Sequence, residues 1–243
     1  MELAALRESI RKIAPAAVPG ARRAPGGLPT GFDDLDRQLR TGGFSRGRIT
    51  EIVGAPSSGK MALALRAIAE QTRAGSLATL LDPHVYPPAA AALGVDLARL
   101  LLVRPPSLSA KDAVRAAEIL ARSRAFSLIA IALPAGARPS AALARRLRAA
   151  AQRTSAALLV IADRGGAVEG AAARIEIAHA RGSSERRACA VVSKGSTTGG
   201  AQRAELALPS IRIDDAPPVA VWPKTTRLAP GVEAGSKAAG GRA

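Results

Sequence analysis

A short glycine-rich segment, Gly54–Lys60, joins an apolar run to a run of helix-forming residues. The preceding residues, 49–53, are mostly apolar and β-branched, as a buried strand requires, and residues 62–70 are mostly Ala and Leu. Two glycines and a lysine in the segment have the spacing of a phosphate-binding loop. Backbone N–H groups in such a turn surround a phosphate, and the helix N-terminus and the lysine add positive charge. The pattern therefore predicts a strand, a nucleotide-binding turn and a helix; a chance glycine turn is the alternative.

Met61 stands directly after the loop lysine, where phosphate-binding loops normally carry Ser or Thr. A hydroxyl at this position ligates Mg²⁺, whereas a thioether does not. We therefore expect ATP as the ligand if the loop is functional, we do not expect Mg²⁺, and we predict no metal site. The other interpretation is a vestigial loop that the chain keeps for its fold. The expected nucleotide-binding residues are Gly54, Ala55, Pro56, Ser57, Ser58, Gly59, Lys60 and Met61.

The chain of 243 residues carries a formal net charge of +16, which favours nucleic acid as a partner and, second, an acidic protein. A compositional bias toward Ala, Arg, Gly and Pro is the alternative explanation. With only three Phe, one Trp and one Tyr, the chain has few residues on which bases can stack. No apolar run reaches the roughly 20 residues of a membrane span, so no membrane partner is expected. Because Cys189 is the single cysteine, we expect no internal disulfide and a reducing compartment, the cytoplasm. With nucleic acid as the favoured partner, we expect a nucleoid-associated protein.

Breaks in composition divide the chain into four expected segments. These are an N-terminal docking helix (1–13), a linker rich in Pro, Gly and Ala (14–27), a folded core (28–215) and a basic, disordered tail (216–243). A short helix is not stable alone in water, so it must dock on the rest of this chain or on another molecule. We expect its apolar face to consist of Leu3, Leu6, Ile10 and Ile13.

Strands alternate with helices through most of the core. Buried strands are expected at 49–53, 77–81, 100–103, 126–133 and 157–162, with helices starting at 62, 87, 110 and 140. This alternation predicts an α/β fold with a mostly parallel sheet and helices on both faces. Three further strands, at 174–178, 187–192 and 203–208, have no long helix between them. They predict antiparallel strands added at one edge of the sheet.

The segments Leu28–Asp36, Gly42–Ile52 and Gly54–Lys60, in this order and spacing, resemble the entry to the ATPase core of the RecA recombinase family. The resemblance covers roughly residues 2–213 and implies a phosphate-loop NTPase core. It also implies that the N-terminal helix docks on a neighbouring subunit, which gives a route to self-association. Lys194 lies where the family places a lysine that reaches a neighbour's nucleotide; an ordinary exposed strand end is the alternative.

The chain departs from the family pattern at several catalytic positions. A catalytic Glu is expected after the strand at 77–81, where the chain has Asp82 and His84; Asp82 either supports Mg²⁺ through water or caps the turn. Ala132 replaces an Asp, and Asp163 replaces a sensor Gln. The two loops that hold single-stranded DNA in the family are shortened, to 134–138 and 165–170. We therefore predict no catalytic residue and no efficient ATP hydrolysis.

Within the family, the short length of the chain and the loss of these catalytic positions resemble the ImuA-type accessory proteins. That resemblance implies a non-catalytic role in SOS-induced error-prone translesion synthesis, with a RecA-type recombinase and a translesion polymerase complex or Y-family polymerase homologue as partners. One alternative is an ATP-dependent, single-stranded DNA-binding ATPase like the recombinases. Another is a plain nucleic-acid-binding protein. The basic surface offers a DNA contact at Arg145, Arg146, Arg148 and Arg153, for which a solvated helix face is the alternative.

Overall fold

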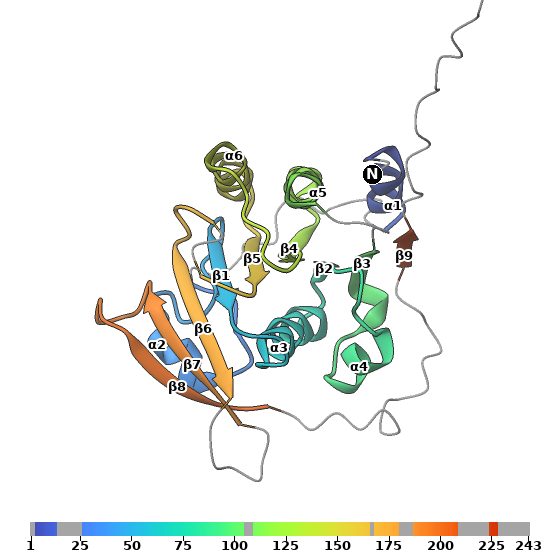
Figure 1. Cartoon of the computed structure of the whole chain (residues 1–243). Coiled ribbons are helices and arrows are strands. Elements are labelled where there is room, and N and C mark those ends of the chain that lie inside the picture. The colour runs from blue at the N-terminus through green and yellow to red at the C-terminus, as the bar shows by residue number, and fades with distance from the viewer. Residues whose placement is uncertain are drawn as a thin grey trace, which may run out of the picture.

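The computed structural model describes residues 3–13, 26–104, 109–165, 168–179, 187–208 and 224–227. Within these residues the strands form one nine-stranded sheet (Figure 1). Its order is β8 (Gln202–Ala207), β7 (Arg187–Lys194), β6 (Ala173–His179), β1 (Ile49–Val53), β5 (Ala157–Ala162), β4 (Phe126–Ala132), β2 (Leu77–Leu81), β3 (Leu100–Arg104) and β9 (Lys224–Arg227).

The sheet is parallel from β6 to β9, whereas β7 pairs in antiparallel orientation with both β6 and β8. This confirms the predicted α/β class with antiparallel strands at one edge. One detail adds to the prediction: β6 pairs in antiparallel orientation with β7, as expected, but it also pairs in parallel with β1, with Ile52 opposite Ile175. Ala173, the first residue of β6, lies opposite Thr50 near the start of β1, so the two strands run in the same direction.

Helices cover both faces of the sheet, as predicted. They are α1 (Leu3–Ile13), α2 (Asp33–Gln38), α3 (Lys60–Arg73), α4 (Pro87–Ala92), a 3-10 turn η1 (Leu97–Arg99), α5 (Ala110–Ser123) and α6 (Ala141–Gln152). Figure 1 shows α1, α5 and α6 along one face and α3 and α4 along the other. In the described part of the chain, no helix has the length and apolarity needed to span a membrane.

Two hydrophobic cores lie on opposite faces of the sheet because the central strands are apolar on both faces. In β4, Leu128 and Ala130 belong to the core beneath α3, whereas Ile129 and Ile131 belong to the core beneath α5 and α6. Such continuous apolar strands are typical of a parallel sheet covered by helices on both sides.

The apolar face of α1 is buried against its own chain. Leu6 is completely buried and Ile10 is 7% exposed, and both join the core that α5 forms with α6. Ile13 packs against the same core, and the side chain of Leu3 lies outside the described residues. Of the two alternatives, docking on the rest of this chain or on another molecule, the structure shows the first. The helix packs on α5, whose buried residues include the small side chains of Ala117 and Ala121.

The tail also differs from expectation. Residues 216–243 were predicted to be disordered, but Lys224–Arg227 forms β9, which pairs in parallel with β3, with Thr226 opposite Val103. Two adjacent β-branched threonines favour a strand, and β3 otherwise leaves an unpaired edge. The predictions for residues 14–25, 216–223 and 228–243 lie outside the described residues.

Candidate nucleotide-binding site

The predicted phosphate loop connects the carboxyl end of β1 to the start of α3. Gly59 has a φ of 99°, which suits glycine, and Ser57 has a φ of 62°. A Cβ at Gly54 would lie 2.3 Å from Oγ of Ser58 and 2.5 Å from the carbonyl oxygen of Ile177, so only glycine fits there. The turn therefore depends on close packing of the Gly54 backbone against Ser58 and Ile177.

Lys60, the first residue of α3, is already engaged inside the chain. Its ammonium donates a hydrogen bond to the carbonyl oxygen of Gly54 at 2.8 Å and forms an ion pair with the carboxylate of Asp163. The side chains of Lys60 and Asp163 are 15% and 29% exposed, so water screens this pair less than it would a surface pair. Because Asp163 follows β5, the adjacent strand, its carboxylate lies beside the loop. An incoming phosphate must displace this carboxylate or share the ammonium with it.

The positions that would support Mg²⁺ have other roles. Met61 is partly buried and packs against the core beneath α3, and Ala132 ends β4 opposite Ile161. Asp82 is 5% exposed and its Oδ1 accepts the N–H of His84 at 2.7 Å. Of the two roles considered for Asp82, the structure shows the turn cap. Among the described residues, no three His, Cys, Asp or Glu side chains are grouped to hold a metal ion.

A cavity of about 480 Å³ lies on one side of the loop. Its lining residues are Ala55, Pro56, Gly136, Ala137, Arg138, Ala162, Asp163 and Arg164. Arg138 and Arg164 follow β4 and β5 and contribute two guanidinium groups beside the loop, and such groups bind phosphate oxygens well. Sequence reasoning missed both residues as phosphate contacts. Their only signal was that each comes shortly after the carboxyl end of a parallel strand near β1, with β5 beside β1 and β4 beside β5.

The opposite side of the loop is less suited to phosphate. A cavity of about 730 Å³ there is lined by Gly54, Asp163, Glu176 and Glu205, with Arg203 and His179 among its other residues. Three carboxylates would repel a polyphosphate. The geometry therefore favours phosphate on the Arg138 and Arg164 side, with the backbone of the loop and Lys60 beneath it.

Comparison with known proteins shows the family. The sequence matches the RecA N-terminal domain family over residues 22–214, most of the chain. The chain belongs to this family. It is 43% identical to Protein RecA of Chlorobaculum parvum over 118 residues, which cover 48% of this chain and 33% of that protein. It is 46% identical to Protein RecA of Picosynechococcus sp. over 106 residues, 43% of this chain and 30% of that protein.

The chain thus aligns with about a third of the length of these curated relatives. Its fold is similar to the crystal structure of the RadB recombinase, with a TM-score of 0.61 and 19% identity, over 75% of this chain and 96% of that one. Membership of the RecA N-terminal domain family agrees with the sheet order and with the position of the loop after β1.

Lys194 is far from Lys60 in this member of the RecA N-terminal domain family. It ends β7, which is antiparallel, and pairs with Arg174 at the start of β6. Lys194 therefore lies at the amino end of the parallel strands, whereas the loop follows the carboxyl end of β1. One chain does not bring the two lysines together, and contact of Lys194 with a neighbour's nucleotide stays a prediction.

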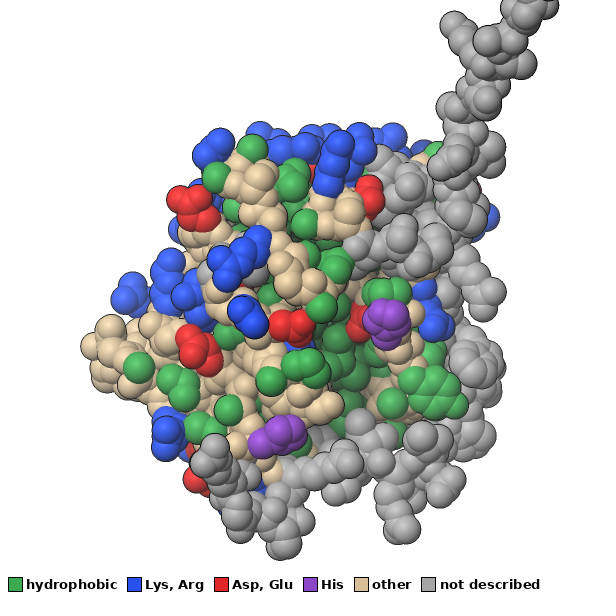
Figure 2. Space-filling view, in the orientation of Figure 1, with side chains coloured by type: hydrophobic (Ala, Val, Ile, Leu, Met, Phe, Trp, Pro, Cys, Tyr) green, Lys and Arg blue, Asp and Glu red, His purple; other side chains and the backbone are tan. Residues whose placement is uncertain are grey.

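The four arginines predicted to contact DNA do not form one uniform stripe. Arg146 donates two hydrogen bonds, of 2.8 and 2.6 Å, to Glu118 on α5, and this partner raises the pKa of Arg146. Arg148 lies against Gly170, where a Cβ would be 2.5 Å from Nη1. Arg145 and Arg153 are exposed. Figure 2 shows Lys and Arg side chains gathered along the edge where α5 and α6 lie in Figure 1.

Proposed function

We propose that this chain is a RecA-like accessory protein that binds ATP without hydrolysing it. Its role would be in DNA repair, during SOS-induced error-prone translesion synthesis in the cytoplasm, at the nucleoid. The observation that carries the proposal is the ion pair between Lys60 and Asp163, formed where Ala132 and Met61 provide no metal ligand.

Phosphoryl transfer depends on groups that the described site does not offer. A metal ion neutralises the charge that develops on the phosphates, and a carboxylate or amide orients the attacking water. A positioned general base alone contributes about 10²- to 10⁴-fold in rate. Asp82 is held in a turn by the N–H of His84, and Asp163 is paired with Lys60. Neither carboxylate is available as a base toward a bound phosphate without breaking these contacts.

Binding of ATP needs fewer groups than its hydrolysis. The N–H groups of the loop, the start of α3 and Lys60 attract phosphate whether or not Mg²⁺ is present. Arg138 and Arg164 add two cations on the open side of the loop. We therefore propose an ATP site that works without Mg²⁺, in which the nucleotide stabilises a conformation and is not turned over.

Docking on a RecA-type recombinase and on a translesion polymerase complex or Y-family polymerase homologue is the partner part of this proposal. Family membership supports it, because a related core can offer a surface similar to the one on which α1 packs in its own chain. We propose that α1 takes part by leaving its own α5 and placing Leu3, Leu6, Ile10 and Ile13 on the partner, or on a second copy of this chain. Helix-in-groove docking of this kind needs few residues and no ATP cycle.

The test measures ATP binding by isothermal titration and phosphate release with single-stranded DNA present, for the wild type and for Lys60→Ala. We expect ATP binding that Lys60→Ala abolishes, and phosphate release no faster than in that variant. DNA-stimulated phosphate release that disappears in Lys60→Ala would instead favour the ATP-dependent, DNA-binding ATPase. Absence of any ATP binding would leave the loop a structural turn and overturn the proposal.

A further inference from the structure

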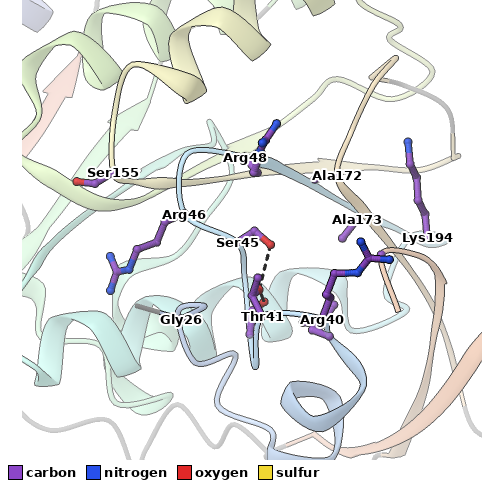
Figure 3. Close-up of a pocket in the computed structure, with 13 residues that line it drawn as sticks. Gly26, Arg40, Thr41, Ser45, Arg46, Arg48, Ser155, Ala172, Ala173 and Lys194 are labelled. Carbon is purple, nitrogen blue, oxygen red and sulfur yellow. Dashed lines mark hydrogen bonds between the residues drawn. The ribbon is translucent and has the colours of Figure 1, made fainter. Parts of the chain in front are cut away.

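A second cavity, of about 840 Å³, lies at the amino ends of β1, β5 and β6, away from the phosphate loop. Figure 3 shows the residues that line it. Arg48 precedes β1, Ser155 precedes β5, Lys194 ends β7, and Arg40 follows α2. Segments more than 140 residues apart in the sequence therefore meet around one hollow.

Cations dominate the polar lining of this cavity. Arg40, Arg48 and Lys194 are exposed, and in the described part of the chain no ion pair involves any of the three. Arg46 also lines the cavity, and the lining contains no Asp or Glu. In Figure 3 the ends of Arg40, Arg48 and Lys194 point to the same side, whereas Arg46 points away from them. Three like charges on one side of a hollow attract an anion strongly and repel one another.

The backbone holds these cations in place. The N–H of Arg40 donates to the carbonyl oxygen of Gly195 at 3.2 Å, which ties the end of α2 to the turn after Lys194. Gly195 has a φ of 78°, and a Cβ there would lie 2.7 Å from the carbonyl oxygen of Ala172. A tight crossing of two backbone segments therefore fixes the backbone positions of Arg40 and Lys194, from which their long side chains extend.

The rest of the lining indicates what kind of anion fits. Thr41 and Ser45 hydroxyls lie 3.0 Å apart and are hydrogen-bonded, and Ser155 adds a third hydroxyl. No aromatic side chain lines the cavity, so it offers no platform for stacking a base. Hydroxyl, backbone and cationic groups are the usual partners of phosphate oxygens. The volume is within the range of about 300–1,000 Å³ that holds a small ligand, so a short stretch of one strand fits and a duplex does not.

We propose that this cavity binds the phosphate backbone of single-stranded nucleic acid, through Arg40, Arg48 and Lys194 and without reading the bases. The choice of nucleic acid as the polyanion rests on the proposed role in DNA repair; the phosphate-binding chemistry rests on the cavity alone. The site is separate from the ATP loop and does not require ATP.

Fluorescence anisotropy with a labelled single-stranded DNA 20-mer tests the proposal across a range of NaCl concentrations. The cavity variant is Arg40→Gln/Arg48→Gln/Lys194→Gln. The matched control, Lys111→Gln/Arg115→Gln/Arg122→Gln, removes three exposed cations from α5 and changes the net charge equally. All six side chains are exposed, so both variants are expected to fold, and circular dichroism checks this. The single variant Arg48→Glu repeats the cavity test with one exposed change.

We expect the cavity variant to lose about tenfold or more in DNA affinity. The slope of log affinity against log salt concentration should also become shallower by about two units, because each neutralised phosphate of a single strand contributes roughly 0.7 to this slope. The control should lose much less. Equal losses in the two triple variants, wild-type binding by the cavity variant, or binding of inorganic tripolyphosphate but not of DNA would each overturn the proposal. Phosphate release by the wild type would contradict the proposed function and leave this site unaffected.

Discussion

The carboxylate of Asp163, just beyond β5, forms an ion pair with the ammonium of Lys60 at the start of α3. In a phosphate loop this ammonium is the full positive charge offered to the ligand. Here an internal carboxylate already occupies it, so the anion of the chain and the anion of a ligand compete for one cation. Under the proposed function, this competition sets the strength of ATP binding, and the missing metal ligands set the rate of hydrolysis.

Removing the competing carboxylate should strengthen nucleotide binding. We expect Asp163→Asn to raise the affinity for ATP by about tenfold, because a charge-assisted hydrogen bond is worth roughly 1.5–3 kcal/mol and partial exposure reduces it. Isothermal titration measures the change. Asp34→Asn, which removes a carboxylate from an exposed pair with Arg37, is the matched control and should leave the affinity unaltered. An Asp163→Asn variant that binds ATP no better than wild type would show that the ion pair does not compete.

Chelation of Mg²⁺ should have little effect on ATP binding. Because Met61 and Ala132 supply no oxygen ligand, we expect EDTA in place of Mg²⁺ to change the affinity of the wild type by less than about twofold. The double variant Met61→Ser/Ala132→Asp, which restores two oxygen donors, should gain a dependence on Mg²⁺. Titrations with and without EDTA test both proteins, and strong Mg²⁺ dependence in the wild type would disprove the expectation.

Truncation inside the α1–α5 contact should destabilise the protein. Leu6 is fully buried, and removing a buried leucine side chain costs about 2–5 kcal/mol, so we expect Leu6→Ala to lower the free energy of unfolding within this range. Urea denaturation gives the value. Arg7→Ala, one residue along on the exposed face, should cost under about 0.5 kcal/mol. Equal stabilities of the two variants would mean that α1 does not pack on its own chain in solution.

A buried ion pair joins β1 to β6 and should behave as a unit. Glu51 is completely buried, and its carboxylate accepts the Nε–H of Arg174 at 2.6 Å and the N–H of Val168 at 3.1 Å. Removing the guanidinium takes away the cation that Arg174 offers to the buried carboxylate of Glu51, so Arg174→Met should cost about 3 kcal/mol or more. The double variant Glu51→Gln/Arg174→Met should be more stable than Arg174→Met alone. Urea unfolding of the single and double variants decides this, and additive losses would argue against coupling.

Asp36 should make stability depend on pH. Burial raises the pKa of Asp36 above its usual 3.8, against the opposing effect of hydrogen bonds from Thr30. The folded state then binds a proton more readily than the unfolded state, so this group lowers the unfolding free energy as pH rises from below 3.8 to above the raised pKa. The stability of Asp36→Asn relative to wild type should therefore increase over this interval in urea unfolding. A flat difference would show that the environment of Asp36 is not as described.

Local patterns predicted most of the fold. The apolar runs at 126–133 and 157–162 predicted β4 and β5 correctly, because a strand that is buried on both faces is apolar along its whole length. Gly75 and Gly94 correctly predicted the ends of two helices. The direction of β6 relative to β1 could not be predicted from the sequence, because it depends on the end of the sheet at which the chain re-enters after β5. The strand β9 was also missed, because its partner β3 lies over 100 residues earlier and only the sheet edge makes pairing favourable.

The site was predicted less completely than the fold. The loop itself follows from the spacing of its glycines and Lys60, a short-range signal. The pairing of Lys60 with Asp163 joins residues 103 positions apart, and no short-range pattern encodes such a contact. Arg138 and Arg164 meet the loop only because β5 lies beside β1 and β4 lies beside β5 in the sheet order. Knowing that order, one would look for cations just after those two strands.

The burial of Leu6 and Ile10 in their own chain also constrains how copies of the protein can assemble. If α1 joins a second copy, it gives up one set of contacts and regains the same set elsewhere, so the exchange gains almost no contact energy. Assembly through α1 would then be governed by protein concentration and by the barrier to detaching the helix, as in domain swapping. Mixing two differently labelled samples would give hybrid oligomers slowly, at the rate of helix release.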